Sequence, residues 1–287
     1  MQFSPFYELN SPMVHERLQE SAAYIKSQTN LKPRVGIILG SGFINFASQI
    51  KEEARILFDE IPNFLPTSSD SNNPGMLILG RVNDVPVAAL IGRLHFYEGH
   101  SMERVVFPTR VLAMLGIETL ILTNAAGGLD TDMVPGDFMI IKDHINMMGD
   151  NPLKGPNLKN LGPRFPEMSQ PYDLHLVERM SAIMKMRNMR HHIGIFCGVS
   201  GPTFETPAEV NYLRLVGANA VGMSTVPESI AANHLGLRVA AFCCITNEAG
   251  GGRNHKMRHN DVTEMAKKSE EPVKEFLTEF IQFLGRS

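Results

Sequence analysis

Short apolar runs without alternating polar residues are the feature that most constrains how this chain folds. They recur along the whole sequence, and segments with helical spacing separate them. Strands that are apolar on both faces are typical of largely parallel sheets covered by helices. The expected strands span 34–40, 76–82, 85–92, 117–123, 137–143, 193–199, 219–223 and 238–246. The pattern therefore predicts an α/β fold with a mixed, mostly parallel twisted sheet flanked by helices.

Helix signals occupy the intervals between these strands. The expected helices span 11–29, 101–115, 173–189 and 227–235, with a further one starting at Thr206 and a long amphipathic one running from about Asp261 to the C-terminus. The irregular stretch 146–172 is longer than compact domains normally carry, so we expect it to be functional or to pack on a neighbour. Because no internal repeat or low-complexity linker occurs, we expect one domain over 1–287.

Composition excludes several classes of protein. A net charge of -3 gives no indication of a nucleic-acid or membrane-surface partner. No apolar run approaches the ~20 residues that span a bilayer. Cys197, Cys243 and Cys244 lie in apolar strand-like sequence, and an odd count with an adjacent pair is a poor disulfide framework. We therefore expect a cytoplasmic protein with no membrane association.

The segment VGMSTVPE (221–228) predicts an elbow from a strand into a helix. Gly222 allows the backbone to approach a ligand closely, and Met223 adds a flexible apolar surface. Ser224 and Thr225 offer hydroxyls and helix-capping oxygens, and Pro227 is harmless in the first helical turn. The N-terminus of a helix is a favourable place for a phosphate.

Two further segments favour the same anion. GSGF (40–43) follows the first strand, where Ser41 offers a hydroxyl and backbone N–H groups, although ordinary turn chemistry explains it equally well. In GRLHFYEGH (92–100), Arg93 and His95 are two residues apart and face the same way on an extended chain. Their donors suit phosphate oxygens.

Tyr97 shares that face, and Glu98 is placed to hold His95 or the Arg93 guanidinium. The alternative is a solvated, charged strand end, which the aromatic and glycine neighbours make the weaker interpretation.

Other segments favour a flat ring. In TNAAGGL (123–129), Asn124 offers an amide, and Ala125 and Ala126 leave space for a planar ligand; tight helix–sheet packing is the alternative. At the end of the strand 238–246, Thr246 and Asn247 lie where open α/β sheets bind ligands.

The segment GPTFETPAE (201–209) adds an aromatic ring and a carboxylate. Phe204 is suited to lie against a planar ligand, and Glu205 to accept from ring N–H groups. Since Thr206 and Glu209 already form a capping box, Glu205 is spare for a ligand.

These segments describe two halves of one site, an oxyanion end and a heterocycle end. No nucleophilic Ser/His/Asp set and no metal-ligand spacing occurs in the sequence. In order, GSGF, GRLHFYEGH, TNAAGGL, GDFMIIKDHIN, NPLKGPN, GPRFPEMS, GPTFETPAE, GANAVGMSTVPE and GLRVAAFCCITN resemble the trimeric purine nucleoside phosphorylases. The resemblance covers about residues 20 to 285.

The resemblance implies that phosphate attacks a purine nucleoside and releases the base and ribose 1-phosphate, with no metal or organic cofactor and with inorganic phosphate as co-substrate. It assigns phosphate to Ser41, Arg93, His95, the Ala125 backbone and Ser224. It assigns the ribose to Tyr97, Met223 and His259, and the base to Phe204, Glu205, Val221 and Asn247, in a site that also takes in Asn124, Ala126, Gly222 and Thr246. The expected catalytic residues are His95, Glu205, Asn247 and His259. Phe165 would enter the neighbouring subunit's site, which implies a homotrimer.

Two residues depart from the family pattern: Asn73 replaces a usual histidine, and Glu248 brings a negative charge after the base-binding asparagine. A related alternative is 5′-methylthioadenosine phosphorylase, which should carry aspartate in place of Asn247. Another is a non-catalytic nucleoside- or phosphate-binding paralogue, against which the joint presence of the anion and base residues argues. We therefore expect an active inosine and guanosine phosphorylase.

Overall fold

The computed structural model describes residues 11–40, 42–67, 75–250 and 270–286. Its elements, with short 3-10 helices written η, are α1 (Ser11–Gln28), β1 (Val35–Leu39), η2 (Ile44–Gln49), β2 (Lys51–Leu57), η3 (Phe58–Glu60), β3 (Met76–Val82), β4 (Val85–Ile91), η4 (Phe96–Glu98), α2 (Met102–Met114), β5 (Thr119–Gly128), β6 (Phe138–Met147), α3 (Leu174–Met186), β7 (His191–Val199), α4 (Pro207–Leu215), β8 (Ala220–Gly222), α5 (Val226–His234), β9 (Arg238–Glu248) and α7 (Glu270–Arg286). Every strand and helix expected from the sequence has a counterpart, and the α/β class is confirmed; the expected start of the last helix near Asp261 lies outside the described residues.

Three strands differ from expectation. β2 was not expected, because its sequence KEEARIL begins with charged residues; it pairs with β3 at the end of the sheet order, where those side chains reach water. β5 and β6 continue four or more residues beyond their expected ends. The small residues of the TNAAGGL segment therefore lie within a strand and not after it.

The sheet is mixed, and part of it closes on itself. Its strand order is β2-β3-β4-β1-β5-β8-β7-β6-β9, and β9 also pairs in parallel with β5. The pairs β1–β4, β1–β5, β6–β7 and β7–β8 are parallel too, while β5–β8 and β6–β9 are antiparallel. The five strands from β5 to β9 thus form a closed ring, which the apolar pattern did not predict.

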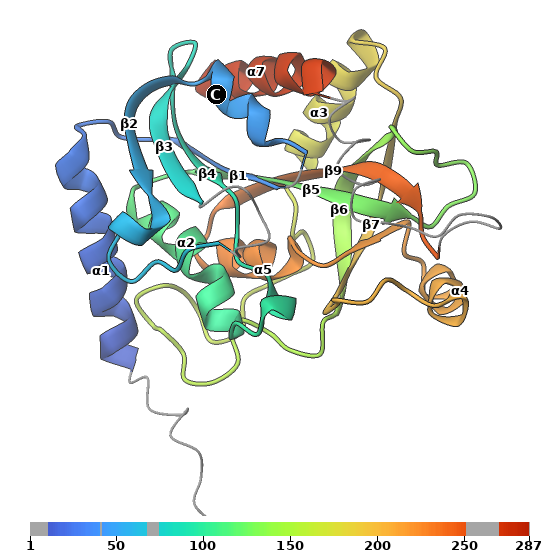
Figure 1. The fold of residues 1–287 in the computed structure, drawn as a ribbon, viewed down its shortest axis with the longest axis horizontal. Helices are drawn as coiled ribbons and strands as arrows, with labels where there is room; N and C mark the ends of the chain where they lie inside the picture. Colours follow the sequence, from blue (N-terminus) through green and yellow to red (C-terminus); the bar gives the residue numbers. More distant parts are fainter. Residues whose placement is uncertain (1–10, 41, 68–74, 251–269, 287) are drawn as a thin grey trace, which may run out of the picture.

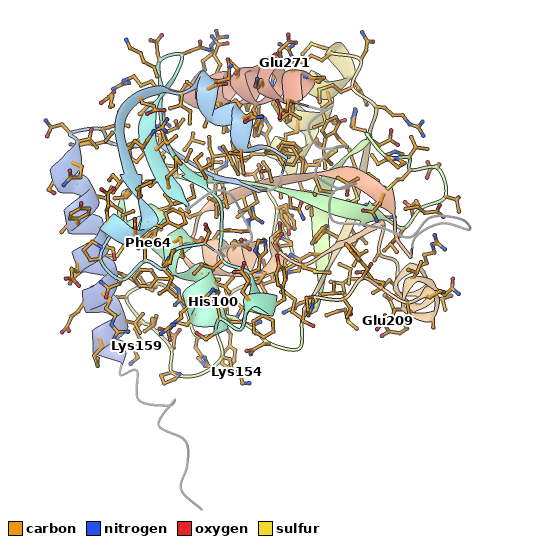
Figure 2. The ribbon with its side chains drawn as sticks, viewed as in Figure 1. Phe64, His100, Lys154, Lys159, Glu209 and Glu271 are labelled. Atoms are coloured by element: carbon orange, nitrogen blue, oxygen red, sulfur yellow. The ribbon has the colours of Figure 1, made fainter. Side chains whose placement is uncertain are left out.

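Helices cover both faces of the sheet. Figure 1 shows α3 and α7 on one side and α2 and α5 on the other, with α1 packed against α2 at the edge. The loop 148–173 runs along the lower margin of the molecule, where Figure 2 labels Lys154 and Lys159, at the opposite margin from Glu271 of α7. Within the described residues, no helix combines the length and apolarity that crossing a bilayer requires.

Phe242 of β9 connects several layers of the core. Its fully buried ring lies 5.1 Å from that of Phe276 on α7 and 5.4 Å from that of Phe43, which follows the first glycine turn. The Phe138 ring of β6 lies 6.5 Å away. Because β9 also carries Thr246 and Asn247, this aromatic cluster holds in place the strand on which both residues lie.

We predict that Phe242→Ala lowers the free energy of unfolding by about 3–5 kcal/mol, since it removes a buried ring and leaves a cavity among these aromatics. Urea unfolding followed by circular dichroism measures the change. A loss below about 1 kcal/mol, the average for an arbitrary substitution, would contradict this role.

Candidate active site

A cavity of about 470 Å³ opens where β1, β4, β5, β8 and β9 end. It brings together most of the residues predicted from the sequence: Arg93, His95, Tyr97, Asn124, Ala125, Ala126, Phe204, Glu205, Val221, Gly222, Met223, Ser224, Thr246 and Asn247. Ser41, Asn73 and His259 lie outside the described residues. The volume is within the usual range for small-molecule sites.

Arg93 lies at the buried end of this cavity. Its side chain is 5% exposed, so the alternative of a solvated strand end is wrong. The segment is also not extended, because β4 ends at Ile91 and Phe96–Glu98 form a 3-10 turn. Arg93, His95 and Tyr97 nevertheless all reach the cavity.

Three of the five N–H groups of the Arg93 guanidinium make hydrogen bonds within the protein. Nη2 donates to the carbonyl oxygens of Thr123 at 2.7 Å and Ile38 at 3.4 Å, and Nη1 donates to Thr225 Oγ1 at 3.3 Å. Nε lies 3.6 Å from Glu228 Oε1. The Nε–H group and one Nη1 hydrogen therefore make no hydrogen bond among the described residues, on a side chain that lines the cavity.

Glu228 is the residue that sequence reasoning missed here. Glu98 was expected to hold either His95 or Arg93, and it holds His95. The carboxylate beside the guanidinium is that of Glu228 on α5, 2% exposed. Burial lowers the pKa of Arg93, and the charges of Glu228 and Tyr97 oppose that shift. A buried charge requires such compensation.

The elbow before α5 is a strained turn. Thr225 has φ 75° and ψ −45°, and the Val226 N–H donates to the Ser224 carbonyl at 2.8 Å, which makes Thr225 the centre of a γ-turn with positive φ. Its side chain caps no helical N–H, contrary to expectation; Thr225 Oγ1 accepts from Arg93 instead. Strain of this kind, about 1–3 kcal/mol, is characteristic of functional sites.

His95 is positioned by Glu98. The His95 backbone N–H donates to Glu98 Oε2 at 2.9 Å, and His95 Nδ1 lies 3.6 Å from Glu98 Oε1. The His95 and Tyr97 rings stack with centroids 4.8 Å apart. Burial raises the pKa of Glu98, but hydrogen bonds and charge from His95, with the charge of His100, outweigh it and lower the pKa overall. The carboxylate therefore stays charged beside His95.

The opposite end of the cavity is apolar with a few polar groups. Phe204 is 44% exposed, an open ring face at the mouth of the site. Burial raises the pKa of the Glu205 carboxyl, and the charge of Glu209 raises it further against a backbone hydrogen bond. Thr206 and Glu209 form the expected capping box, so Glu205 remains available.

The Asn247 amide has a defined orientation. Its Oδ1 accepts from Thr246 Oγ1 at 2.9 Å, and its Nδ2 donates to the Glu248 carbonyl at 3.2 Å, which leaves a second Nδ2 hydrogen. The Glu248 side chain does not line the cavity; it is 58% exposed and lies 4.0 Å from Arg214. The negative charge after Asn247 thus points away from the site.

Asn124 carries a further unused amide. The residue is 3% exposed, and neither its Oδ1 nor its Nδ2 has a hydrogen-bond partner among the described residues. A buried amide without partners is costly unless something supplies them. Asn124 lines the cavity, so a ligand or water there would satisfy it.

Three lining residues gave no signal in the sequence. Ile44, Thr67 and Pro202 border the cavity but are apolar or small and carry no distinctive chemistry. Conversely, Phe165 does not line the cavity of its own chain. It sits on the loop 148–173, 85% exposed, with the Arg164 guanidinium 5.6 Å from its ring centre.

Comparison with known proteins gives the family. Residues 34–282 match the profile described as "Phosphorylase superfamily". The chain is 47% identical over 253 residues to purine nucleoside phosphorylase 1 of Bacillus subtilis (strain 168), covering 88% of this chain and 93% of that protein. The chain belongs to the purine nucleoside phosphorylase family.

Other members of this family agree over most of their length. The purine nucleoside phosphorylase of Rattus norvegicus is 39% identical over 277 residues, covering 94% of this chain and 96% of that protein. The crystal structure of Schistosoma mansoni purine nucleoside phosphorylase in complex with inosine superposes with a TM-score of 0.88 at 34% identity, covering 93% of this chain and 95% of that one. The nucleoside phosphorylase fold is therefore confirmed.

We predict that Arg93→Lys raises the KM for phosphate at least about tenfold, because three donors on one nitrogen cannot replace the contacts that the separate guanidinium nitrogens make and also reach the cavity. Steady-state rates at varied phosphate measure the change. Arg34→Lys is the control, since Arg34 is paired with Glu118 on the surface away from the cavity. Equal phosphate KM values for the two variants would contradict the assignment.

Proposed function

We propose that the protein cleaves purine nucleosides with inorganic phosphate, giving the free base and ribose 1-phosphate. The observation that carries this is the single cavity with Arg93, His95 and Ser224 at one end and Phe204, Glu205 and Asn247 at the other. The relatives named purine nucleoside phosphorylase support the same reaction. Phosphate is the co-substrate, and neither a metal nor an organic cofactor takes part.

The reaction separates charge, and the two ends of the cavity match the two charges. As the bond from C1′ to the base breaks, positive charge develops on the sugar and negative charge on the purine. A phosphate held by Arg93, His95, Ser224, Ser41 and the Ala125 backbone stabilises the sugar and forms the new bond to C1′. The free Nδ2 hydrogen of Asn247 donates to purine N7, and a well-placed donor contributes roughly 3 kcal/mol.

The remaining residues position the substrate. Tyr97, Met223 and His259 contact the ribose, with His259 reaching the 5′-hydroxyl. Phe204 and Val221 pack on the base, and Glu205 accepts from its ring N–H. The walls of the cavity are completed by Asn124, Ala126, Gly222 and Thr246.

A substrate panel tests the proposal. Phosphate-dependent release of base is measured with inosine, guanosine, adenosine, 5′-methylthioadenosine and a pyrimidine nucleoside. We expect turnover of inosine and guanosine. Preference for methylthioadenosine would favour the related phosphorylase, and no turnover of any purine nucleoside would leave a binding protein.

We predict that Asn247→Asp shifts the ratio of kcat/KM for adenosine over inosine upward. The carboxylate accepts from a 6-amino group but, when ionised, cannot donate to a 6-oxopurine. Asn247→Ala is the control, because it removes the donor without adding an acceptor and should lower both activities. An unchanged ratio in Asn247→Asp counts against the role of this residue.

We also predict that the KM for inosine rises as pH falls from neutral toward acid. The charged Glu205 accepts from the ring N–H more strongly than the neutral carboxyl does, and its raised pKa means that the charged form is lost at a higher pH than for an ordinary glutamate. Glu205→Gln should have a higher KM for inosine at neutral pH, equivalent to a loss of about 1.5–3 kcal/mol of binding free energy. Its KM should vary less with pH at saturating phosphate. If the KM for inosine changed with pH in the same way in the wild type and in Glu205→Gln, the role assigned to Glu205 would be wrong.

The protein forms a homotrimer in which Phe165 closes the neighbouring site. The large exposed ring on a long surface loop supports this arrangement. Phe165→Ala should raise the KM for inosine and leave the KM for phosphate unchanged, since the ring would touch only the nucleoside side. Sedimentation velocity checks that the trimer persists; an unchanged inosine KM in an intact trimer contradicts the proposal.

The protein works in the cytoplasm. Cys197, Cys243 and Cys244 are all buried and free, which fits a reducing compartment.

A further inference from the structure

Thr123 joins the two segments that form the anion end of the cavity. It lies on β5 next to β1 and is fully buried. Thr123 Oγ1 accepts from the Gly40 backbone N–H at 3.1 Å and donates to the Ile38 carbonyl at 3.1 Å. Its own carbonyl accepts from Arg93 Nη2 at 2.7 Å.

The Thr123 hydroxyl does not reach a ligand directly, because Thr123 is fully buried and does not line the cavity. Its single hydrogen and one lone pair are used within the protein. Gly40 and Arg93, by contrast, both line it. Thr123 therefore acts on the site only through these two neighbours.

The contact between Thr123 and Gly40 is too close to admit a side chain. A Cβ atom on Gly40 would lie 2.5 Å from the Thr123 carbonyl oxygen, the same oxygen that holds Arg93. The Gly40 carbonyl in turn accepts from the Phe43 N–H at 3.0 Å, so both sides of the glycine peptide are fixed. Any shift of Gly40 relative to β5 thus changes its distance from the guanidinium.

We propose that Thr123 is a positioning residue that sets the spacing between the Gly40 turn and Arg93 and thereby the affinity for phosphate. This rests on the proposed function, in which these two segments bind the anion. A valine here has nearly the same shape but leaves the buried Gly40 N–H without its acceptor, a loss that displaces the end of β1 or leaves it strained. The nucleoside end of the cavity is on β8, β9 and the 201–206 segment, away from this contact.

Two matched pairs isolate the hydroxyl: wild type against Thr123→Val, and Thr123→Ser against Thr123→Ala. Within each pair we expect loss of the hydroxyl to raise the phosphate KM and the phosphate Kd from calorimetry about tenfold. The KM for inosine at saturating phosphate should change less than twofold. Thr109→Val is the control for a buried threonine, since Thr109 Oγ1 has no hydrogen-bond partner in the described part of the chain.

The outcomes separate the two proposals. Turnover by the wild type tests the function, whereas the phosphate Kd ratio tests Thr123 even without turnover. Equal phosphate affinity within both pairs, or an equal rise in the inosine KM, would overturn the positioning role. If Thr123→Val does not fold, the phosphate Kd of Thr123→Ser compared with that of Thr123→Ala tests the same role.

Discussion

The burial of one positive charge, that of Arg93, is the constraint on which the rest of the site depends. A guanidinium with a 5% exposed side chain is tolerated only where its donors are satisfied and its charge is balanced. Two strand carbonyls and the Thr225 hydroxyl accept hydrogen bonds from Arg93, and the Glu228 carboxylate, 3.6 Å from Nε, balances its charge. The donors that these partners leave unbonded belong to a side chain that lines the cavity, so the same interactions that make burial possible also define an anion site.

This constraint explains why the elbow before α5 is strained. Thr225 adopts a positive φ that a β-branched residue normally avoids, and its hydroxyl is thereby directed to Arg93. Three residues later, the same helix supplies Glu228. The turn and the helix thus act together, because one places the hydroxyl and the other the carboxylate on the same guanidinium.

Sequence reasoning predicted every strand except β2, and most of the composition of the cavity, because both depend on local signals. Apolar runs mark buried strands, and unusual polar residues at their ends mark the place where ligands bind in such sheets. The closed ring from β5 to β9 was not predictable in this way, since it depends on the pairing of β9 with both β5 and β6. The partnership of Arg93 with Glu228 was missed for the same reason: 135 positions separate them, and Glu98 was nearer in sequence.

The central claim is that one cavity holds a phosphate and a purine on opposite sides of a ribose. A crystal structure with phosphate and an inosine analogue that phosphate cannot cleave tests it most directly. We predict phosphate oxygens within hydrogen-bond distance of Arg93 and Ser224, and the purine between Phe204 and Asn247 in the same cavity. An anion bound away from Arg93, or a base that touches neither Glu205 nor Asn247, would contradict the account.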